Sequence, residues 1–349
     1  MNFPNFEKDN KSLLKKYLSK DVFEKLITKK TKFGYTLAQA INSGIVYSDS
    51  NIGAYAGDEE SYILFSNLFD PIIEDYHGFK NNDKHQSDFN IDKINLSNPD
   101  VEGKYILSTR IRVGRNLKNT ALGSLISNKE RNEVETKIKN ALTSLNDDLS
   151  GEYFSLNKMS DSKKEEMIND HFLFKQGDRF MEAAGLNRNW PEGRGIFYNE
   201  KKDFLVWVNE EDQMRIISMQ KGADIKSVFH RLTTALNKLQ QKLEFAFSEH
   251  LGYISSCPTN LGTAMRASVH IYLPLLGKHE NIFEKITQKH HLQIRGVNGE
   301  HSDSKESIFD ISNERRLGIT EVDAIKDLYN GVVELIKEEQ ILESNFKKT

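Results

Sequence analysis

Cysteine is almost absent from this sequence. Cys257 is the only one in 349 residues. One thiol cannot form a disulfide within the chain, which favours a reducing compartment. The sequence also lacks the run of about 18 apolar residues that a membrane-spanning helix needs, and its first residues lack the apolar stretch of a signal peptide. We therefore expect a cytoplasmic protein without a membrane partner.

An excess of charge is missing as well. The 48 Lys and Arg residues nearly balance the 51 Asp and Glu residues, and the net charge is −3. Without an overall basic field we expect no nucleic-acid partner. Hydrophobic residues make up 38% and charged residues 28% of the chain, a composition typical of globular proteins. The length allows one large domain or two ordinary ones.

Arginine is missing from the first 109 residues, and all 13 arginines follow from Arg110 onward. The planar, permanently charged guanidinium group binds phosphate and carboxylate better than the ammonium group of lysine does. The later part of the chain therefore has the residues for an anion site. The alternative is a simple difference in composition between two domains.

The chain divides into two domains near residue 98. Residues 1–80 show the apolar spacing of short helices, for example at Leu13, Leu14, Tyr17 and Leu18. Residues 80–103 are polar and weakly periodic, as linkers are. We therefore predict a small, all-helical N-terminal domain over 1–98 and a second domain over 99–349.

The second domain alternates between strand and helix patterns. Helices are predicted from Ser127, over 225–243 and from near Thr320. The predicted strands cover residues 105–113, 195–198, 204–208, 214–219, 265–273 and 292–295. The short polar connections 199–203 and 209–212 imply antiparallel neighbours, since a parallel crossover needs a dozen residues or more. The prediction is an α+β domain, with an antiparallel sheet flanked by helices.

Several predicted strands carry arginine on one face. Because side chains alternate along a strand, Ser108, Arg110 and Arg112 share a face, and so do Arg266, Ser268 and His270. Arg215 and Arg295 lie on other strands. If the strands are neighbours, the five arginines converge, and a nucleoside triphosphate is a suitable counter-charge. The alternative is that each arginine pairs with a nearby acidic side chain.

Acidic residues lie in two loops next to these strands. Glu210 and Glu211 belong to the turn NEED (209–212), and Glu300 lies in the polar loop RGVNGEHSDSKES (295–307), which is long enough to form a lid. A solvated turn and a mobile surface loop are the alternatives. Neither the Walker A nor the GxGxxG motif occurs, nor do the HRD and DFG motifs of protein kinases. Side chains would therefore have to hold a triphosphate.

Six segments together resemble the phosphagen (guanidino) kinase family, and its arginine kinase branch in particular. They are STRIR (108–112), HFLFKQGDRF (171–180), GRGIF (193–197), NEED (209–212), CPTNLGT (257–263) and RASVH (266–270). The resemblance runs from about residue 40 to the end of the chain. It implies the guanidino kinase fold, whose catalytic domain is like that of glutamine synthetase, and a reversible transfer of phosphoryl from ATP to a guanidino nitrogen with Mg²⁺.

The resemblance also implies a set of site residues. The positions that match nucleotide-binding residues, for ATP or ADP, are Ser108, Thr109, Arg110, Ile111, Arg112, His171, Arg215, Arg266, Ala267, Ser268, Val269, His270, Arg295, Gly296, Val297, Asn298 and Gly299. Those that match the guanidinium-binding and catalytic residues are Glu211, Cys257 and Glu300. The substrate loop matches Asn51, Ile52, Gly53, Ala54 and Tyr55.

Further roles follow from the same resemblance. Glu211 is expected to act as the main base, and Glu300 to align the guanidinium group. The sulfur of Cys257 is expected beside that cation, which would favour the thiolate. Asp49 and Arg179 match a pair that supports the closed substrate loop. No protein ligand is assigned to Mg²⁺, although Glu210 is a candidate through water.

Two positions depart from the pattern of arginine kinases. Asn51 stands where the substrate loop commonly has glycine, and Asn298 stands where the lid often has arginine. Tyr55, which is expected to contact the amino-acid end of the substrate, is retained, and this keeps L-arginine ahead of taurocyamine.

Other functions and the oligomeric state stay open at this point. The alternatives are a kinase for another guanidine, a protein-arginine kinase and a nucleotide-binding protein without activity. Monomer and homodimer are both compatible with the family.

Overall fold

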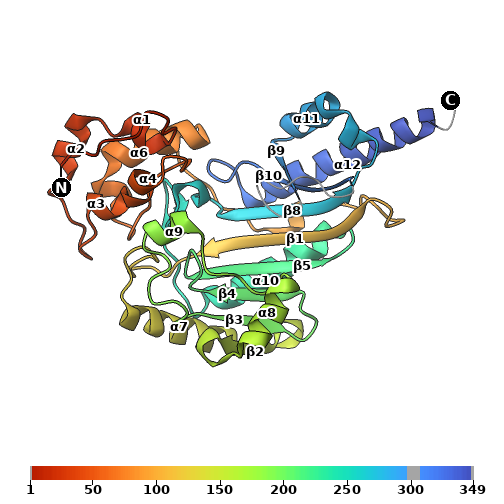
Figure 1. Cartoon of the computed structure of the whole chain (residues 1–349). Helices are drawn as coiled ribbons and strands as arrows, with labels where there is room; N and C mark the ends of the chain where they lie inside the picture. Colours follow the sequence, from red (N-terminus) through yellow and green to blue (C-terminus); the bar gives the residue numbers. More distant parts are fainter. Residues whose placement is uncertain (1, 297–306, 347–349) are drawn as a thin grey trace.

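Short helices form the N-terminal part of the computed structural model, which describes residues 2–296 and 307–346 (Figure 1). Ser12, Ser19 and Thr36 cap the first three helices with their side-chain oxygens. The helices are α1 (Leu13–Tyr17), α2 (Lys20–Leu26), α3 (Leu37–Ala40), α4 (Asn42–Val46), α5 (Ser61–Leu64) and α6 (Ser66–His77). The predicted helical N-terminal domain is confirmed.

The larger part of the chain is built on one sheet. Its described residues form eight strands in the order β2-β3-β4-β5-β1-β8-β10-β9, and every neighbouring pair is antiparallel. The strands are β1 (Ile106–Arg115), β2 (Gly151–Ser155), β3 (Gly195–Asn199), β4 (Phe204–Val208), β5 (Met214–Lys221), β8 (Met265–Tyr272), β9 (Leu292–Gly296) and β10 (Ile308–Asn313). A separate two-stranded ribbon pairs β6 (Phe247–Ser248) with β7 (Gly252–Tyr253).

Long helices cover one face of this sheet. The amphipathic α10 (Ile225–Gln240) packs on β1 and β5, α12 (Glu321–Phe346) packs on β8, β9 and β10, and α7 (Asn128–Leu142) packs on β2 and β3 (Figure 1). The main apolar core lies between these layers. The shorter helices are α8 (Asp161–Asn169), α9 (Arg179–Ala183) and α11 (Glu280–Lys289). The opposite face carries a smaller apolar cluster over β3, β4 and β5, and the site described below lies on the same side of the sheet.

The predicted elements of this part are mostly confirmed. Ser127 and Glu130 form both halves of the capping box that begins α7, and Thr320 bonds to Asp323 at the start of α12. Two strands of the sheet, β2 and β10, had not been predicted, and neither had the ribbon strands β6 and β7 or the helices α8, α9 and α11. The segment IFDISN (308–313) carries Asp310 and Ser312, whose polar side chains weaken the apolar signal of a strand.

The predicted linker packs against the larger part of the chain. Phe89 stacks on Phe229 of α10 with ring centroids 6.1 Å apart, and the backbone N–H of Asp88 donates to Glu321 at 2.7 Å. The position of the domain boundary at residue 98 stays a prediction.

The N-terminal helices share a core with the larger part. Leu122, Ala246, Ile254 and Leu317 belong to the same buried cluster as the helices α1 to α6. The small domain is therefore fixed against the large one by apolar packing. No helix among the described residues combines the length and the apolar character needed to cross a membrane.

A contact between two glycines holds the loop 50–55 in place. Gly53 has a positive φ of +79°, and its carbonyl accepts the N–H of Gly44 at 3.0 Å. A Cβ atom on Gly44 would lie 2.6 Å from the Gly53 Cα and 2.7 Å from its carbonyl oxygen. Only glycine at position 44 allows the loop to approach α4 this closely.

The variant Gly44→Ala should therefore be destabilised, because the added methyl group must push the loop away. We expect a loss of about 1–3 kcal/mol in the free energy of unfolding, as for other overpacked sites, measured by urea denaturation. Val46→Ala, at an exposed position of the same helix, is the control and should stay within about 0.5 kcal/mol of the wild type. Equal stability of the two variants would contradict this account.

Candidate active site

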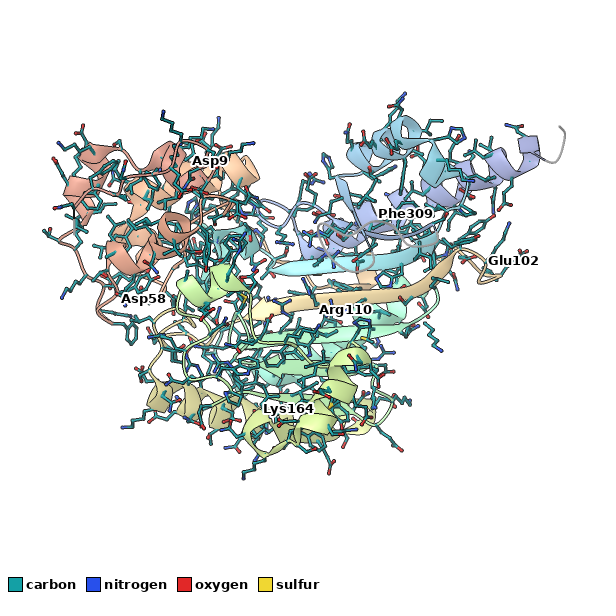
Figure 2. The ribbon with its side chains drawn as sticks, in the orientation of Figure 1. Asp9, Asp58, Glu102, Arg110, Lys164 and Phe309 are labelled. Carbon is teal, nitrogen blue, oxygen red and sulfur yellow. The ribbon has the colours of Figure 1, made fainter. Side chains whose placement is uncertain are left out.

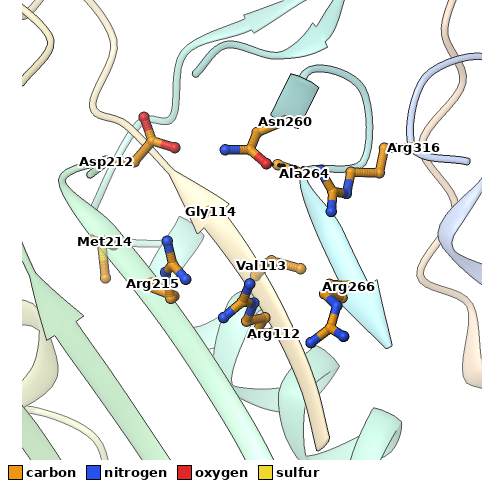
Figure 3. Close-up of a pocket in the computed structure, with 10 residues that line it drawn as sticks. All are labelled: Arg112, Val113, Gly114, Asp212, Met214, Arg215, Asn260, Ala264, Arg266 and Arg316. Carbon is orange, nitrogen blue, oxygen red and sulfur yellow. Dashed lines mark hydrogen bonds between the residues drawn. The ribbon is translucent and has the colours of Figure 1, made fainter. Parts of the chain in front are cut away.

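Strand register brings three arginines to one face of the sheet. On β1, Arg112 lies directly opposite Arg266 of β8, and Gly114 lies opposite Arg215 of β5. Residues that face each other across strands point to the same side. Figure 3 shows the guanidinium groups of Arg112, Arg215 and Arg266 around one small space, with Arg316 beside them. The predicted convergence of the arginines is confirmed for these strands.

Only some of these cations have acidic partners. Arg215 lies 2.8 Å from Glu210 and 3.4 Å from Glu211, and Arg266 lies 2.8 Å from Asp310. Within residues 2–296 and 307–346, Arg110 and Arg112 form no ion pair. Pairing with nearby acids thus explains Arg215 and Arg266 but leaves two positive charges uncompensated.

The pKa values of Arg110 and Arg112 are lowered, as expected for buried cations without acidic partners. Burial, together with the positive charges of Arg215 and Arg266, lowers the pKa of Arg110 to about 9. Burial and the charges of Arg215, Arg110 and Arg266 likewise hold the pKa of Arg112 well below its ordinary value. Like charges directly across a sheet destabilise it. A bound polyanion would remove this repulsion.

A cavity of about 910 Å³ opens over these strands. Its lining includes seven of the predicted nucleotide-binding residues: Ser108, Thr109, Arg110, His171, Arg266, Ser268 and His270. Figure 2 shows Arg110 near the middle of the sheet. The cavity has the size of a small-molecule site, and its basic lining suits a nucleoside triphosphate.

Other predicted nucleotide-binding residues point away from the cavity. The side chains of Ile111, Ala267 and Val269 are buried in the core beneath the sheet. Thr109 lines the cavity, but its hydroxyl donates to the carbonyl of Gly222. Alternation along β1 and β8 requires this, since their neighbours face the site. These residues position the arginines, and their own side chains are turned from the cavity floor.

Three successive acids close one end of the arginine cluster. Glu210 and Glu211 are largely buried, so NEED is not a solvated turn. Burial and the negative charge of Asp212 raise the pKa of Glu211 to about 7, although Arg215 opposes the shift. Asp212 accepts hydrogen bonds from Asn116 at 2.8 Å and from the N–H of Ser256 at 2.9 Å. These bonds hold Asp212 in place, and Glu211 is a buried carboxyl group whose raised pKa suits proton exchange near neutrality.

Cys257 lies in a small apolar cluster beside Glu211. The cluster also contains Tyr55, Ala184 and Leu186, with Met181 packed against it. The thiol is only 8% exposed, and it contacts the hydroxyl of Thr259 at 3.2 Å. Burial and the negative charge of Glu211 raise the pKa of Cys257 to about 12.

The thiol is therefore neutral when no ligand is bound, and the expected thiolate is not formed by the protein alone. The cation on which that expectation depended belongs to the expected substrate, and the charged group of the chain that acts most strongly on the thiol is instead an acid, Glu211.

The predicted substrate loop contributes mainly one side chain. Ile52 and Ala54 are buried in the core of the N-terminal helices, Gly53 supports the turn, and Asn51 is exposed. Tyr55 alone of the five reaches the cluster that contains Cys257. The chain thus places an aromatic side chain from the small domain next to the thiol of the large one.

The expected pair between the domains is present. Arg179, the first residue of α9, forms an ion pair with Asp49, and its guanidinium carbon lies 4.8 Å from the ring centroid of Tyr47. The hydroxyl of Ser43 donates to the carbonyl of Phe180. These contacts hold the loop that precedes Tyr55 against α9.

The far end of the predicted site is only partly described. Arg295 lies opposite Asp310 in the sheet, and its guanidinium group donates to Gln293. Gly296 ends β9 and pairs with Phe309. Val297, Asn298, Gly299 and Glu300 lie outside the described residues.

Three site residues had not been predicted from the sequence. Trp207 lies on the arginine face, with its ring centroid 5.8 Å from the guanidinium carbon of Arg110 and 5.5 Å from that of Arg215. The continuously apolar sequence FLVWV does not show which of its side chains face the site. Trp207 lies directly opposite Arg215 across β4 and β5, so the two side chains point to the same face. This pairing was the signal that could have identified Trp207 as a site residue. Asp310 and Arg316 come from segments to which no strand or site had been assigned.

Comparison with known proteins agrees with this geometry. The model of the ATP:guanido phosphotransferase C-terminal catalytic domain matches residues 133–342, and that of the N-terminal domain matches residues 8–74. The chain belongs to the ATP:guanido phosphotransferase family, and it is a phosphotransferase.

Two curated relatives are arginine kinases. The protein from Penaeus vannamei, Arginine kinase Lit v 2, is 50% identical over 95% of this chain and 94% of its own length. The protein from Anthopleura japonica is 53% identical over 95% of this chain, which spans about half (47%) of that relative's length. A solved lombricine kinase structure is 39% identical, with a TM-score of 0.93 over 99% of this chain and 96% of the other.

The variant Glu211→Gln tests the acidic end of the site in this phosphotransferase. Because the amide keeps the shape but cannot accept a proton, turnover should fall about 10²- to 10⁴-fold, while MgATP binding by calorimetry stays nearly unchanged. In the wild type, kcat/KM should rise with pH through an inflection near 7, where Glu211 ionises. An unchanged inflection in the variant, or near-normal turnover, would remove the assignment of Glu211 as base.

Proposed function

We propose that this enzyme transfers the γ-phosphoryl group of MgATP reversibly to a guanidino nitrogen of L-arginine. The observation that supports this best is one continuous arrangement. Unpaired arginines lie over the sheet, and a buried carboxyl group with a raised pKa lies at their end, next to Cys257 and Tyr55. The end with the arginines suits a triphosphate, and the end with the buried carboxyl group, Cys257 and Tyr55 suits a cation.

The arginines hold the phosphates in this proposal. Phosphoryl transfer asks mainly for positioning and charge stabilisation. Arg112, Arg215 and Arg266 surround the space next to the acids, so they would bind the transferred group and the departing phosphate. Arg110 lies deeper along β1 and would hold the remaining phosphates. The unpaired charge of the ligand-free cluster favours this binding.

The acids prepare the acceptor. A free guanidinium group has a pKa above about 12, so its nitrogen is a poor nucleophile until a proton leaves. Glu211 would accept a hydrogen bond from the guanidinium and take that proton as the new N–P bond forms and the bond to the β-phosphate oxygen breaks. Glu300 is proposed to align the same group from the lid. The buried thiol of Cys257 would contact the guanidinium from the side.

Magnesium is proposed to bind mainly through phosphate oxygens and water. The described residues include no group of three or more His, Cys, Asp or Glu side chains arranged for a metal ion. Glu210, 2.8 Å from Arg215, is the acid best placed to reach a metal-bound water. Mg²⁺ would neutralise charge on the phosphates.

L-arginine is preferred over other guanidines because of Tyr55. Its ring reaches the cluster at Cys257 from the substrate loop, where the amino-acid end of the substrate is expected. The exposed Asn51 replaces the usual glycine, so taurocyamine stays the alternative substrate. A cytoplasmic location, small-molecule partners alone and a monomer or homodimer remain predictions.

A substrate panel with MgATP tests this proposal. Arginine, taurocyamine, creatine and glycocyamine are supplied separately, and the acid-labile phosphoguanidine is measured. We expect product with arginine at a kcat/KM at least about tenfold above the others, since specific contacts at one end of a substrate are worth more than about 1 kcal/mol. Preferred turnover of taurocyamine would correct the substrate, and no product from any guanidine would refute the proposal.

A further inference from the structure

The segment that carries Cys257 is held by hydrogen bonds to its carbonyl groups. It runs from Ser255 into the short 3₁₀ turn η4 (Pro258–Asn260), which immediately follows the cysteine. The carbonyl oxygens of residues 255–259 all accept a hydrogen bond. Because so many backbone acceptors are fixed, the thiol has little freedom to move.

Donors from the small N-terminal domain bind three of these five carbonyls. The hydroxyl of Tyr62 donates to Ser255 at 2.8 Å, and the N–H of Ala56 donates to Ser256 at 2.8 Å. His77, the last residue of α6, places Nε2 2.9 Å from the carbonyl oxygen of Pro258. The small domain thus holds the cysteine segment as well as supplying Tyr55.

The imidazole of His77 is a neutral donor in this contact. Burial lowers the pKa of His77 to about 4, and the positive charge of Arg316 adds to the effect. A carbonyl oxygen can only accept, so Nε2 carries the hydrogen. The bond therefore does not depend on a charged ring.

The turn is held from its other side by the large domain. Arg316 donates to the carbonyl of Thr259 at 2.8 Å and to the side chain of Asn260 at 2.9 Å. The hydroxyl of Thr259 contacts the sulfur of Cys257. A shift of η4 would therefore move the thiol relative to Glu211.

We propose that His77 is a positioning residue for the guanidinium site, because its ring fixes the carbonyl of Pro258 and through this turn the thiol of Cys257. This role rests on the proposed function for its catalytic consequence. His77 itself does not touch the reacting atoms. Without it, Pro258 keeps only the longer bond from the N–H of Leu261 at 3.3 Å.

The full-length variants His77→Ala and His77→Gln test the role, with His290→Ala as the control. The Nε2 atom of glutamine is able to replace the lost donor, whereas alanine has none. His290 also carries a bonded Nε2, but its partner is Glu334, on α12. Each variant is compared with the wild type in two measurements: the kinetics with each substrate, and the rate at which iodoacetamide labels the chain.

Labelling has a simple interpretation here because Cys257 is the only cysteine. We expect His77→Ala to label at least about fivefold faster than the wild type, because a loosened turn exposes the buried thiol. The kcat/KM for the guanidino substrate should fall about 10- to 100-fold, as for a small misplacement of a binding group. The KM for MgATP should stay within about twofold, since the phosphate-binding arginines lie on other strands. In His77→Gln, the labelling rate and the kcat/KM for the guanidino substrate should both return most of the way to the wild-type values.

Several outcomes would overturn the role. If His77→Ala matches the wild type in labelling rate and in kinetics, the bond between His77 and Pro258 does not position the thiol of Cys257. Equal losses for both substrates, or a His77→Gln variant as impaired as His77→Ala, would show general damage to the fold. If wild-type protein phosphorylates no guanidine, the proposed function fails, while the labelling comparison still decides whether His77 holds the thiol.

Discussion

The repulsion between arginines on neighbouring strands is the constraint on which the rest of this site depends. Arg112 and Arg266 face each other across β1 and β8, and Arg112 has no acidic partner among the described residues. Such an arrangement costs stability in a protein without ligand. The fold tolerates it because helices on the opposite face bury a large apolar core against the same strands. The sheet thus holds mutually repelling positive charges at the place where a polyanion would bind.

The acids and the small domain complete the site around that cluster. Glu210 and Glu211 balance Arg215, and burial together with the neighbouring negative charges raises the pKa of Glu211. The N-terminal helices bring Tyr55 to this end and bind the segment of Cys257 through its carbonyl groups. In the proposed function, the arginine-free domain helps to shape the place where the guanidino substrate would lie.

The sequence predicted the strands that show a simple period. Alternation placed Arg110 and Arg112 on one face, and short connections predicted the antiparallel neighbours β3, β4 and β5, as found. The pairing of distant strands was beyond such reasoning. Whether Arg112 meets Arg266 depends on register between segments about 150 residues apart, which local pattern does not encode. β10 was missed because Asp310 and Ser312 face the polar site and break its apolar pattern.

The raised pKa of Cys257 shows the limit of arguing from an expected ligand. The resemblance placed a cation next to the sulfur, but that cation is the substrate, and the protein alone surrounds the thiol with apolar groups and Glu211. Shifts of pKa arise from burial and neighbouring charge, both of which need the folded chain. Cys257 does lie beside Glu211, while its role and the state of its thiol in an occupied site stay predictions.

The variant Arg112→Met gives the most direct test of the central claim, that the arginine cluster is unstable until it binds a polyanion. Thermal unfolding is measured with and without MgADP, beside Arg112→Lys, which keeps the charge. We predict that Arg112→Met is at least as stable as the wild type without nucleotide and binds MgADP about 10- to 100-fold more weakly, the value of one charge-assisted hydrogen bond. Lower stability without nucleotide together with unchanged MgADP affinity would contradict it.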